Sequence, residues 1–81
     1  VLFRSRVAVV GHTDATGSLA LNRRISLGRA RSVRDALVER GVAAARLDAE
    51  GVGFLAPRAS NATDAGRARN RRVELVQAEA P

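Results

Sequence analysis

The sequence predicts a single small α/β domain, an α+β sandwich in which helices pack on one face of a small sheet. Three observations support this prediction. One long segment, from about Leu19 to Arg40, repeats its apolar residues with the period of an α-helix. Short runs rich in Val, Leu and Ala on either side of it have the character of strands, and glycines separate these segments. The predicted order is strand, helix, strand, strand.

The N-terminal half contains the first strand, the long helix and the second strand. The first strand is expected from about Arg6 to Val10, where Gly11 permits a sharp turn out of the strand. The helix is expected to end before Gly41, which suits the left-handed residue that commonly closes a helix. After a short connector, the second strand is expected from about Leu47 to Val52.

The C-terminal part begins with a loop, expected from Phe54 to Ala62. Thr63 follows this loop and is suited to cap a short helical turn, because its hydroxyl accepts hydrogen bonds from free backbone N–H groups. The last strand is expected from Arg71 to Val76, because apolar and polar side chains alternate there.

We assign residues 6–77 to the domain and predict a disordered tail at 78–81. Residues 1–5, Val-Leu-Phe-Arg-Ser, match the translation of a common sequencing adapter. We interpret them as non-native and leave them out of the fold prediction. The domain then begins directly at its first readable strand, so we expect the natural protein to continue upstream.

The composition argues against several classes of site. The chain has 81 residues, no cysteine and one histidine, which argues against a disulfide framework and against a metal site built from thiolates or histidines. No stretch approaches the roughly 20 apolar residues of a membrane span. We expect neither a metal ion nor a cofactor.

The net charge of +6 is weak evidence for a nucleic-acid partner. All 14 basic residues are arginine and alanine is also frequent, a combination that a GC-rich coding sequence produces. Tyrosine and tryptophan are absent, so the stacking platforms of single-strand binders are missing. We expect no nucleic-acid partner, and a basic nucleic-acid-binding module stays as an alternative.

Arg29 is a candidate binding residue because of its position on the predicted helix. At about 100° per residue it falls near the middle of the apolar stripe, whereas the other charged residues fall on the opposite face. The stripe consists of Ile25, Ala30, Val33, Ala36 and Leu37. A buried arginine keeps its proton, so it needs a carboxylate or an equivalent acceptor, or it must reach the rim. The helix therefore predicts an anion-binding position, and Asn22 lies on the same face.

Asp14 is the second candidate, in the loop Gly11–Gly17 that joins the first strand to the helix. Loops of this kind commonly build binding sites on a rigid scaffold. If the strand packs against the helix, Asp14 and Arg29 flank a common crevice with one negative and one positive group. An ordinary structural ion pair between these two residues is the alternative.

Several motifs, in this order, resemble the OmpA-like peptidoglycan-binding domain. They are Gly11-His12-Thr13-Asp14-x-x-Gly17, Asn22-x-x-Ile25-Ser26-x-x-Arg29-Ala30-x-x-Val33, Gly51-x-Gly53, Pro57, Asn61 and Gly66-Arg67-Ala68-x-Asn70-Arg71-Arg72-Val73-Glu74. The resemblance covers nearly all of the chain from Arg6 to Val76. It implies a noncatalytic module with a βαβαββ fold, whose first strand and helix are absent here, so a strand-helix-strand-strand remnant is expected.

The resemblance implies noncovalent binding of peptidoglycan through the diaminopimelate of its peptide stem. In the family, the residues that correspond to Asp14 and Arg29 form a clamp for the ligand's ammonium and carboxylate groups. Asn22 matches an asparagine on the same helical face, and Arg71 matches an arginine that often reaches the site from the last strand. Thr13 is a further candidate ligand-binding residue, with hydrogen bonding to the loop backbone as its alternative.

The resemblance also implies a location in the periplasm, tethered to the outer membrane or cell envelope by a segment upstream of this chain. Contact with a membrane is expected only through that segment. A homo-oligomeric parent protein is left open.

A cell-wall hydrolase that uses His12 and Asp14 is the remaining alternative. No second histidine or nucleophile accompanies these residues, so we interpret His12 as a structural residue that is hydrogen bonded within the fold. Arg72 is interpreted as part of a solvated strand entrance.

Overall fold

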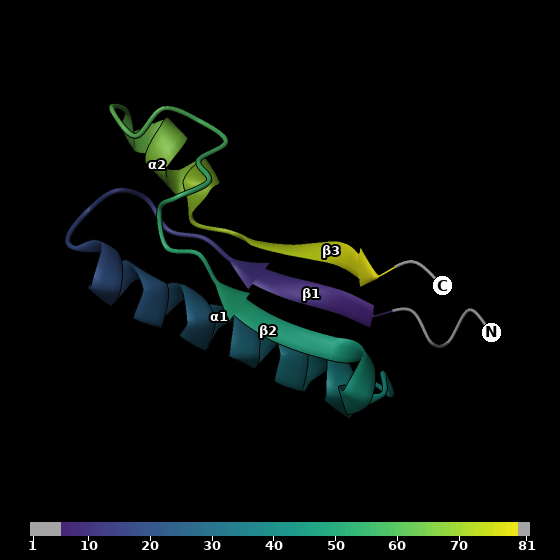
Figure 1. Cartoon of the computed structure of the whole chain (residues 1–81). Helices are drawn as coiled ribbons and strands as arrows, with labels where there is room; N and C mark the ends of the chain where they lie inside the picture. The colour runs from purple at the N-terminus through teal and green to yellow at the C-terminus, as the bar shows by residue number, and fades with distance from the viewer. Residues whose placement is uncertain (1–5, 80–81) are drawn as a thin grey trace.

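In the computed structural model, which describes residues 6–79, a long helix lies along one face of a three-stranded sheet (Figure 1). The elements are β1 (Arg6–Gly11), α1 (Leu19–Glu39), the short 3-10 helix η2 (Ala44–Arg46), β2 (Leu47–Gly51), α2 (Asp64–Asn70) and β3 (Val73–Glu79). This arrangement confirms the α+β class. The interpretation of residues 1–5 falls outside the described residues.

The sheet has the strand order β2-β1-β3, with β1 in the centre. β1 runs parallel to β2 and antiparallel to β3, and Val9 of β1 is paired with Ala49 of β2 and Leu75 of β3. Residues paired in this way point to the same face of a sheet. In the described part of the chain, the outer edge of β3 has no neighbouring strand.

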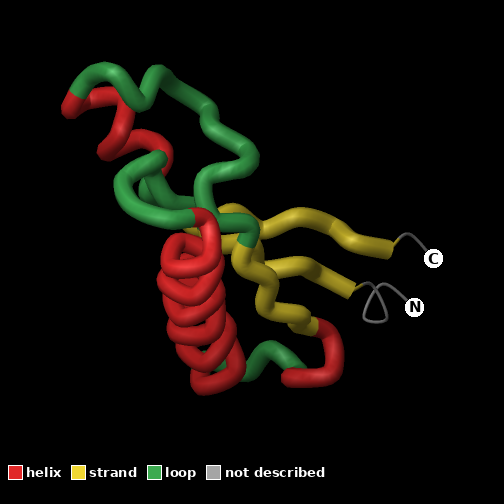
Figure 2. Tube along the Cα trace, turned by 60° about the vertical axis from the view of Figure 1, so that its left-hand side comes forward, coloured by secondary structure: helices red, strands yellow, loops and turns green. Residues whose placement is uncertain are grey.

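The core lies between α1 and the sheet and is small, as the composition predicts. Its fully buried residues are Val9 and Ala30, and Leu47 is 5% exposed. Helix α1 packs mainly on β1 and β2 and touches β3 little, as Figure 2 shows from the side. Leu75 of β3 is consequently 59% exposed.

Of the elements in the described range 6–79, only α1 covers a face of the sheet, whereas α2 and the loop before it extend beyond the strand ends (Figures 1 and 2). The prediction that helices pack on one face therefore holds for α1 alone. The reason is visible in the sequence of α2, Asp-Ala-Gly-Arg-Ala-Arg-Asn, which has no large apolar side chain to bury against a sheet.

The ends of α1 are closed by local hydrogen bonds. Ser18 Oγ accepts a hydrogen bond from the Leu21 N–H at 3.1 Å, as an N-cap does. Gly41 has a φ of 102° and donates to Val38 O at 3.0 Å, while the Val42 N–H donates to Leu37 O at 3.1 Å. This pair of bonds is the Schellman motif, and it confirms the predicted role of Gly41.

Two predicted strand ends are wrong. The last strand begins at Val73, because Arg71 is the C-cap residue of α2, and it continues to Glu79. β3 pairs with β1 along the whole of β1, from Gly11 opposite Val73 to Arg6 opposite Glu79. The strand β3 includes residues 78 and 79 of the predicted tail.

Gly11 does not form the predicted turn. It is the last residue of β1, and its backbone faces α1 at Ser26, where no side chain fits. The contact brings α1 close to the strand ends. Among residues 6–79, none of the helices has the length and the apolar character to cross a membrane.

Candidate ligand-binding site

Asp14 is a fixed, ionised carboxylate in the loop between β1 and α1. The residue is 8% exposed, and its two carboxylate oxygens have different partners. Oδ1 accepts a hydrogen bond from the Thr16 N–H at 3.0 Å, and Oδ2 accepts one from Arg71 Nη1 at 2.6 Å. The Thr16 N–H and then the Arg71 guanidinium hold the pKa of Asp14 below its usual value.

Arg71 reaches Asp14 from the end of α2. Its backbone N–H donates to Arg67 O at 3.2 Å, which closes the helix, and its side chain is 43% exposed. The resemblance predicted Arg71 near the site but on the last strand. The structure places it two residues before β3, where it pairs with Asp14 across 57 positions of sequence.

Arg29 is an exposed residue of α1, so the prediction that it lies on the core-facing stripe is wrong. The inward row of the helix is Asn22, Ser26 and Ala30, all buried, and Ile25 beside Arg29 is 38% exposed. Small residues face inward because α1 lies so close to Gly11 that a large side chain would not fit. Arg29 therefore reaches the rim, and its side chain has no hydrogen bond or ion pair with any residue in 6–79.

Arg29 and Arg71 line the same pocket, which has a volume of about 480 Å³. The remaining lining residues are Ser32 and Val33 of α1 and Arg72 and Val73 from the last strand and its entrance. Three arginines and no acidic residue are among the residues that line this pocket. The alternative in which Asp14 and Arg29 form an ordinary ion pair is not observed, because Asp14 pairs with Arg71 instead.

Asn22 holds the Asp14 loop against α1. It is 4% exposed, and its Nδ2 donates to Thr16 O at 2.7 Å and to Ser18 O at 2.9 Å. Both amide hydrogens are used inside the loop. Only Oδ1 of Asn22 is left for a ligand.

Thr13 is 4% exposed, and its backbone N–H donates to Gly53 O at 2.9 Å. Its Oγ1 is buried and has no hydrogen-bond partner in the described part of the chain. The alternative that the Thr13 hydroxyl forms a hydrogen bond with the loop backbone is therefore wrong. Only the backbone N–H of Thr13 makes such a bond within the described residues.

Glu74 is a structural hub that the sequence analysis missed. Its Oε1 lies 3.0 Å from His12 Nε2, and its Oε2 lies 3.1 Å from both Arg58 Nε and Arg72 Nε. The Arg72 guanidinium is the main cause of the lowered pKa of Glu74. The strand register could have revealed this contact. Glu74 is opposite Val10, and His12 lies two residues after Val10, so Glu74 and His12 point to the same face of the sheet.

His12 faces Glu74 and not Asp14. Burial and then Arg72 lower the pKa of the imidazole, and the nearby Glu74 opposes them. In the range 6–79 no hydrogen bond joins His12 to Asp14, so the pair that a hydrolase would need is not assembled. Arg72 has a side chain that is 16% exposed and donates to Ala56 O at 3.0 Å, so it is not part of a solvated entrance.

Asn70 fixes the position of Arg71. It is fully buried, and its Oδ1 accepts from the Arg58 N–H at 2.8 Å and the Ala59 N–H at 3.0 Å. Its Nδ2 donates to Ala59 O at 2.9 Å and to Asn61 Oδ1 at 2.8 Å. The loop before α2 is thereby tied to the end of α2, next to Arg71.

The described residues contain no cluster of three or more His, Cys, Asp or Glu side chains that would hold a metal ion. A carboxylate with a low pKa contacts Arg71, and Arg71 lines a pocket together with Arg29. This arrangement suits a small ligand that carries both signs of charge.

Comparisons with known proteins find relatives that match most of this chain. The model of the OmpA family matches residues 3–71. The peptidoglycan-binding protein ArfA of Mycobacterium tuberculosis is 51% identical over 72 residues, which make up 89% of this chain and 22% of that protein. The match to the family begins inside the segment 1–5, whose non-native origin stays a prediction.

Two solved structures have the same fold. The peptidoglycan-associated lipoprotein from Burkholderia pseudomallei has a TM-score of 0.84 and 35% identity, covering 88% of this chain and 60% of that chain. The cell wall anchor of the T6SS from Pseudomonas aeruginosa has a TM-score of 0.78 and 41% identity, and the match covers 89% of this chain and 53% of that chain. The chain thus spans less than two thirds of each of these relatives.

Proposed function

Because the chain belongs to the OmpA family, we propose that it binds peptidoglycan noncovalently, through the diaminopimelate of the peptide stem. The proposal depends on how three charged side chains, those of Asp14, Arg29 and Arg71, are arranged. Asp14 is ionised and fixed, Arg29 has no partner in the described structure, and Arg71 links them by contacting Asp14 and lining the pocket of Arg29. The names of ArfA and of the T6SS anchor support the choice of the cell wall as the target.

The ligand chemistry matches the two charges. The free end of diaminopimelate carries an ammonium and a carboxylate on one carbon. Asp14 suits the ammonium because its carboxylate stays charged at neutral pH. Arg29 suits the carboxylate because a guanidinium offers two parallel N–H donors. Thr13 Oγ1 and Asn22 Oδ1 are the remaining polar atoms of the proposed site that have no partner in the described structure and are able to add neutral hydrogen bonds.

The proposed role is noncatalytic anchoring of a cell-envelope protein to the wall in the periplasm. The tether to the outer membrane or envelope would be supplied by the parent protein. A single small polar ligand offers little apolar area, so one domain should bind weakly. Persistent anchoring then requires several domains on one polymer, which makes a homo-oligomeric parent part of the proposal.

Two other functions are less well supported. The hydrolase needs His12 and Asp14 to cooperate, and they face different partners. The nucleic-acid module has the three arginines of the pocket in its favour, but no aromatic side chain lines that pocket. Absence of released muropeptides, and absence of salt-dependent DNA retention in a filter assay, are the expected results.

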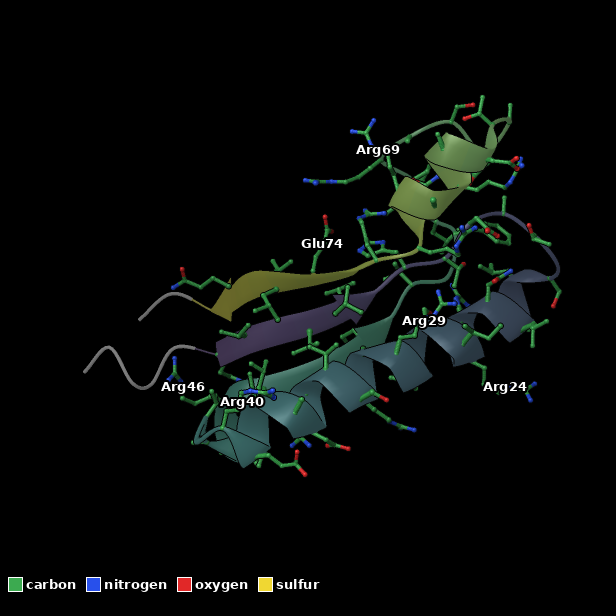
Figure 3. The ribbon with its side chains drawn as sticks, turned by 180° about the vertical axis from the view of Figure 1, so that it is seen from behind. Arg24, Arg29, Arg40, Arg46, Arg69 and Glu74 are labelled. Carbon is green, nitrogen blue, oxygen red and sulfur yellow. The ribbon has the colours of Figure 1, made fainter. Side chains whose placement is uncertain are left out.

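Sedimentation with purified sacculi tests the proposal. The chain should pellet with diaminopimelate-type sacculi, and Arg29→Ala or Asp14→Asn should abolish most of that retention, because each change leaves one ligand charge without its partner. Arg24→Ala is the matched control, since Arg24 is also an exposed arginine of α1 but lies on the outer side of the helix (Figure 3). Equal retention of Arg29→Ala and Arg24→Ala would refute the clamp.

A second arm tests the ligand itself. Sacculi in which lysine replaces diaminopimelate keep the ammonium but lack the neighbouring carboxylate. Retention on them should be several-fold lower. Equal retention on both types would leave peptidoglycan binding in place and exclude diaminopimelate as its determinant.

A further inference from the structure

The Arg71–Asp14 ion pair occupies the position that a ligand ammonium would need. Arg71 Nη1 lies 2.6 Å from Asp14 Oδ2, which is a short, charge-assisted contact. The other oxygen, Oδ1, is already used by the Thr16 N–H. A ligand ammonium would therefore have to share an oxygen that already accepts a hydrogen bond, and at Oδ2 it would lie beside the positive charge of Arg71.

The two partners are held very differently. Asp14 has a side chain that is 12% exposed and is fixed by the Thr16 N–H, whereas the side chain of Arg71 is 43% exposed. Within residues 6–79, the Arg71 guanidinium makes a single hydrogen bond, the one to Asp14. Arg72, its neighbour, donates to two carbonyl oxygens and contacts Glu74 as well. Arg71 is thus the mobile partner of the pair, and its release breaks one contact only.

A destination for the released guanidinium exists next to it. Arg71 already lines the pocket that Arg29 borders, and no carboxylate faces that pocket. A carboxylate that enters the pocket would find Arg29 and Arg71 on its border and no acidic residue among the lining residues. Such a ligand carboxylate would compete with Asp14 for the positive charge of Arg71.

We propose that Arg71 is a displaceable counter-ion that sets the specificity of the site. In the free chain it neutralises Asp14. On binding, the ligand ammonium replaces it at Oδ2, and the guanidinium turns to join Arg29 at the ligand carboxylate. This proposal rests on the proposed function for the identity of the ligand, but the exchange at Asp14 is a property of the chain itself.

The exchange selects for ligands that carry both charges. An amine alone must displace Arg71 and leaves its guanidinium without an acceptor. An acid alone has to break the Arg71–Asp14 pair and leaves Asp14 without a cation. A zwitterion replaces both partners at once, so it binds without uncompensated charge. Arg71 is therefore a specificity-determining residue as well as a contact.

The test compares two probes that differ only in their carboxylates. Diaminopimelic acid carries two ammonium and two carboxylate groups, and cadaverine is the same diamine without the carboxylates. Both are titrated into the ¹⁵N-labelled chain and followed by NMR. In Arg71→Gln, the affinity for cadaverine should rise about two- to fivefold, the range expected for removal of one partly exposed ion pair, while the affinity for diaminopimelic acid should fall.

The opposite signs of these two effects distinguish exchange from simple contact. If Arg71 only contacted the ligand, Arg71→Gln would weaken diaminopimelic acid and leave cadaverine unchanged, and that result would overturn the proposal. Arg71→Lys keeps a displaceable cation and should stay close to the parent for cadaverine. Arg69→Gln is the matched control, because Arg69 is an exposed arginine of α2 that points away from the sheet (Figure 3).

A third readout does not depend on any ligand. The carboxyl ¹³C resonance of Asp14 reports its pKa, which Arg71 helps to lower. Arg71→Gln should raise that pKa and Arg69→Gln should leave it in place. An unchanged pKa in Arg71→Gln would show that the ion pair does not form, which overturns the exchange. Failure of the parent to bind diaminopimelic acid, with the cadaverine and pKa effects present, would instead refute the proposed function.

Discussion

The backbone of Gly11 in β1 meets the backbone of Ser26 in α1 so closely that a Cβ atom on Gly11 would lie 2.0 Å from Ser26 O. Gly51 of β2 makes the same kind of contact, with a Cβ position 2.4 Å from Leu27 N. Ser26 is fully buried, and its hydroxyl accepts a hydrogen bond from the Gly53 N–H at 3.0 Å. These contacts fix the spacing between α1 and the sheet at the end of the sheet where the loop that contains Asp14 begins.

Gly11→Ala should therefore destabilise the fold. The added methyl group would push backbone against backbone, and neither side has a flexible group that moves away. The free energy of unfolding should fall by about 2–3 kcal/mol, at the upper end of overpacking effects. Urea titration of parent and variant measures it.

Gly28→Ala is the control, because a Cβ on Gly28 would have no atom within 4 Å. Gly28 is exposed in the interior of α1, where alanine is the better helix former. This variant should be more stable than the parent by up to about 1 kcal/mol. Similar losses in both glycine variants would contradict the close-packing argument.

Arg29→Ala should separate binding from stability. Arg29 is exposed and has no hydrogen bond or ion pair within residues 6–79, so its removal should change the free energy of unfolding by no more than about 0.5 kcal/mol. Binding of sacculi should nevertheless be lost. Thermal unfolding and sedimentation on one protein preparation test both points, and a large drop in stability would mean that Arg29 has a structural role.

Asn70→Ala should damage both the fold and the site. The change removes four hydrogen bonds of a fully buried side chain and leaves two backbone N–H groups, those of Arg58 and Ala59, without their acceptor. The expected loss is about 2–4 kcal/mol. Since Asn70 positions Arg71, the Asp14 pKa should rise in the fraction that stays folded.

Ser60→Ala provides the comparison for Asn70 in a thermal unfolding experiment. Ser60 is exposed in the same loop, and within the described residues its hydroxyl accepts a single hydrogen bond, from the Ala62 N–H. Its removal should cost less than about 1 kcal/mol. An Asn70→Ala variant that is as stable as Ser60→Ala would show that the buried amide is not what ties this loop down.

The fold was predictable where local rules act. Short stretches of sequence predicted the existence of α1, the left-handed conformation of Gly41 and the capping of α2 by Thr63. The structure confirms each of these predictions. The extension of β3 beyond Val76 was not predictable in this way, because it depends on pairing with β1, in which Gln77 is opposite Val7 and Glu79 is opposite Arg6. Strand length there is a property of the pair.

The site was predictable in its residues but not in its pairing. Helical periodicity places Arg29 on the apolar stripe only if the largest apolar residues face inward. In the structure the close contact at Gly11 favours the small Ser26 and Ala30 on the inner face and turns Arg29 to the rim. Asp14 then pairs with Arg71, a contact across the whole chain that no local pattern encodes.

His12 should make the stability of the fold depend on pH near neutrality. Burial, and then the Arg72 charge, lower its pKa from the usual 6.5, so the folded chain binds this proton less readily than the unfolded chain. Stability from the neutral imidazole is complete above pH 6.5 and is lost as the pH falls below that value. The slope should not exceed about 1.4 kcal/mol per pH unit for one proton.

The measurement is thermal unfolding of the parent and of His12→Asn between pH 7.5 and 5.5. This window lies above the usual pKa values of 3.8 for Asp14 and 4.5 for Glu74, whose pKa is lowered in the fold, so these carboxylates stay charged in both states. The parent should lose stability across the window, and His12→Asn should lose little, even if it starts from a lower melting temperature. Parallel curves would show that the proton is taken up elsewhere, and a parent curve that rises towards pH 5.5 would mean that Glu74 outweighs burial at His12.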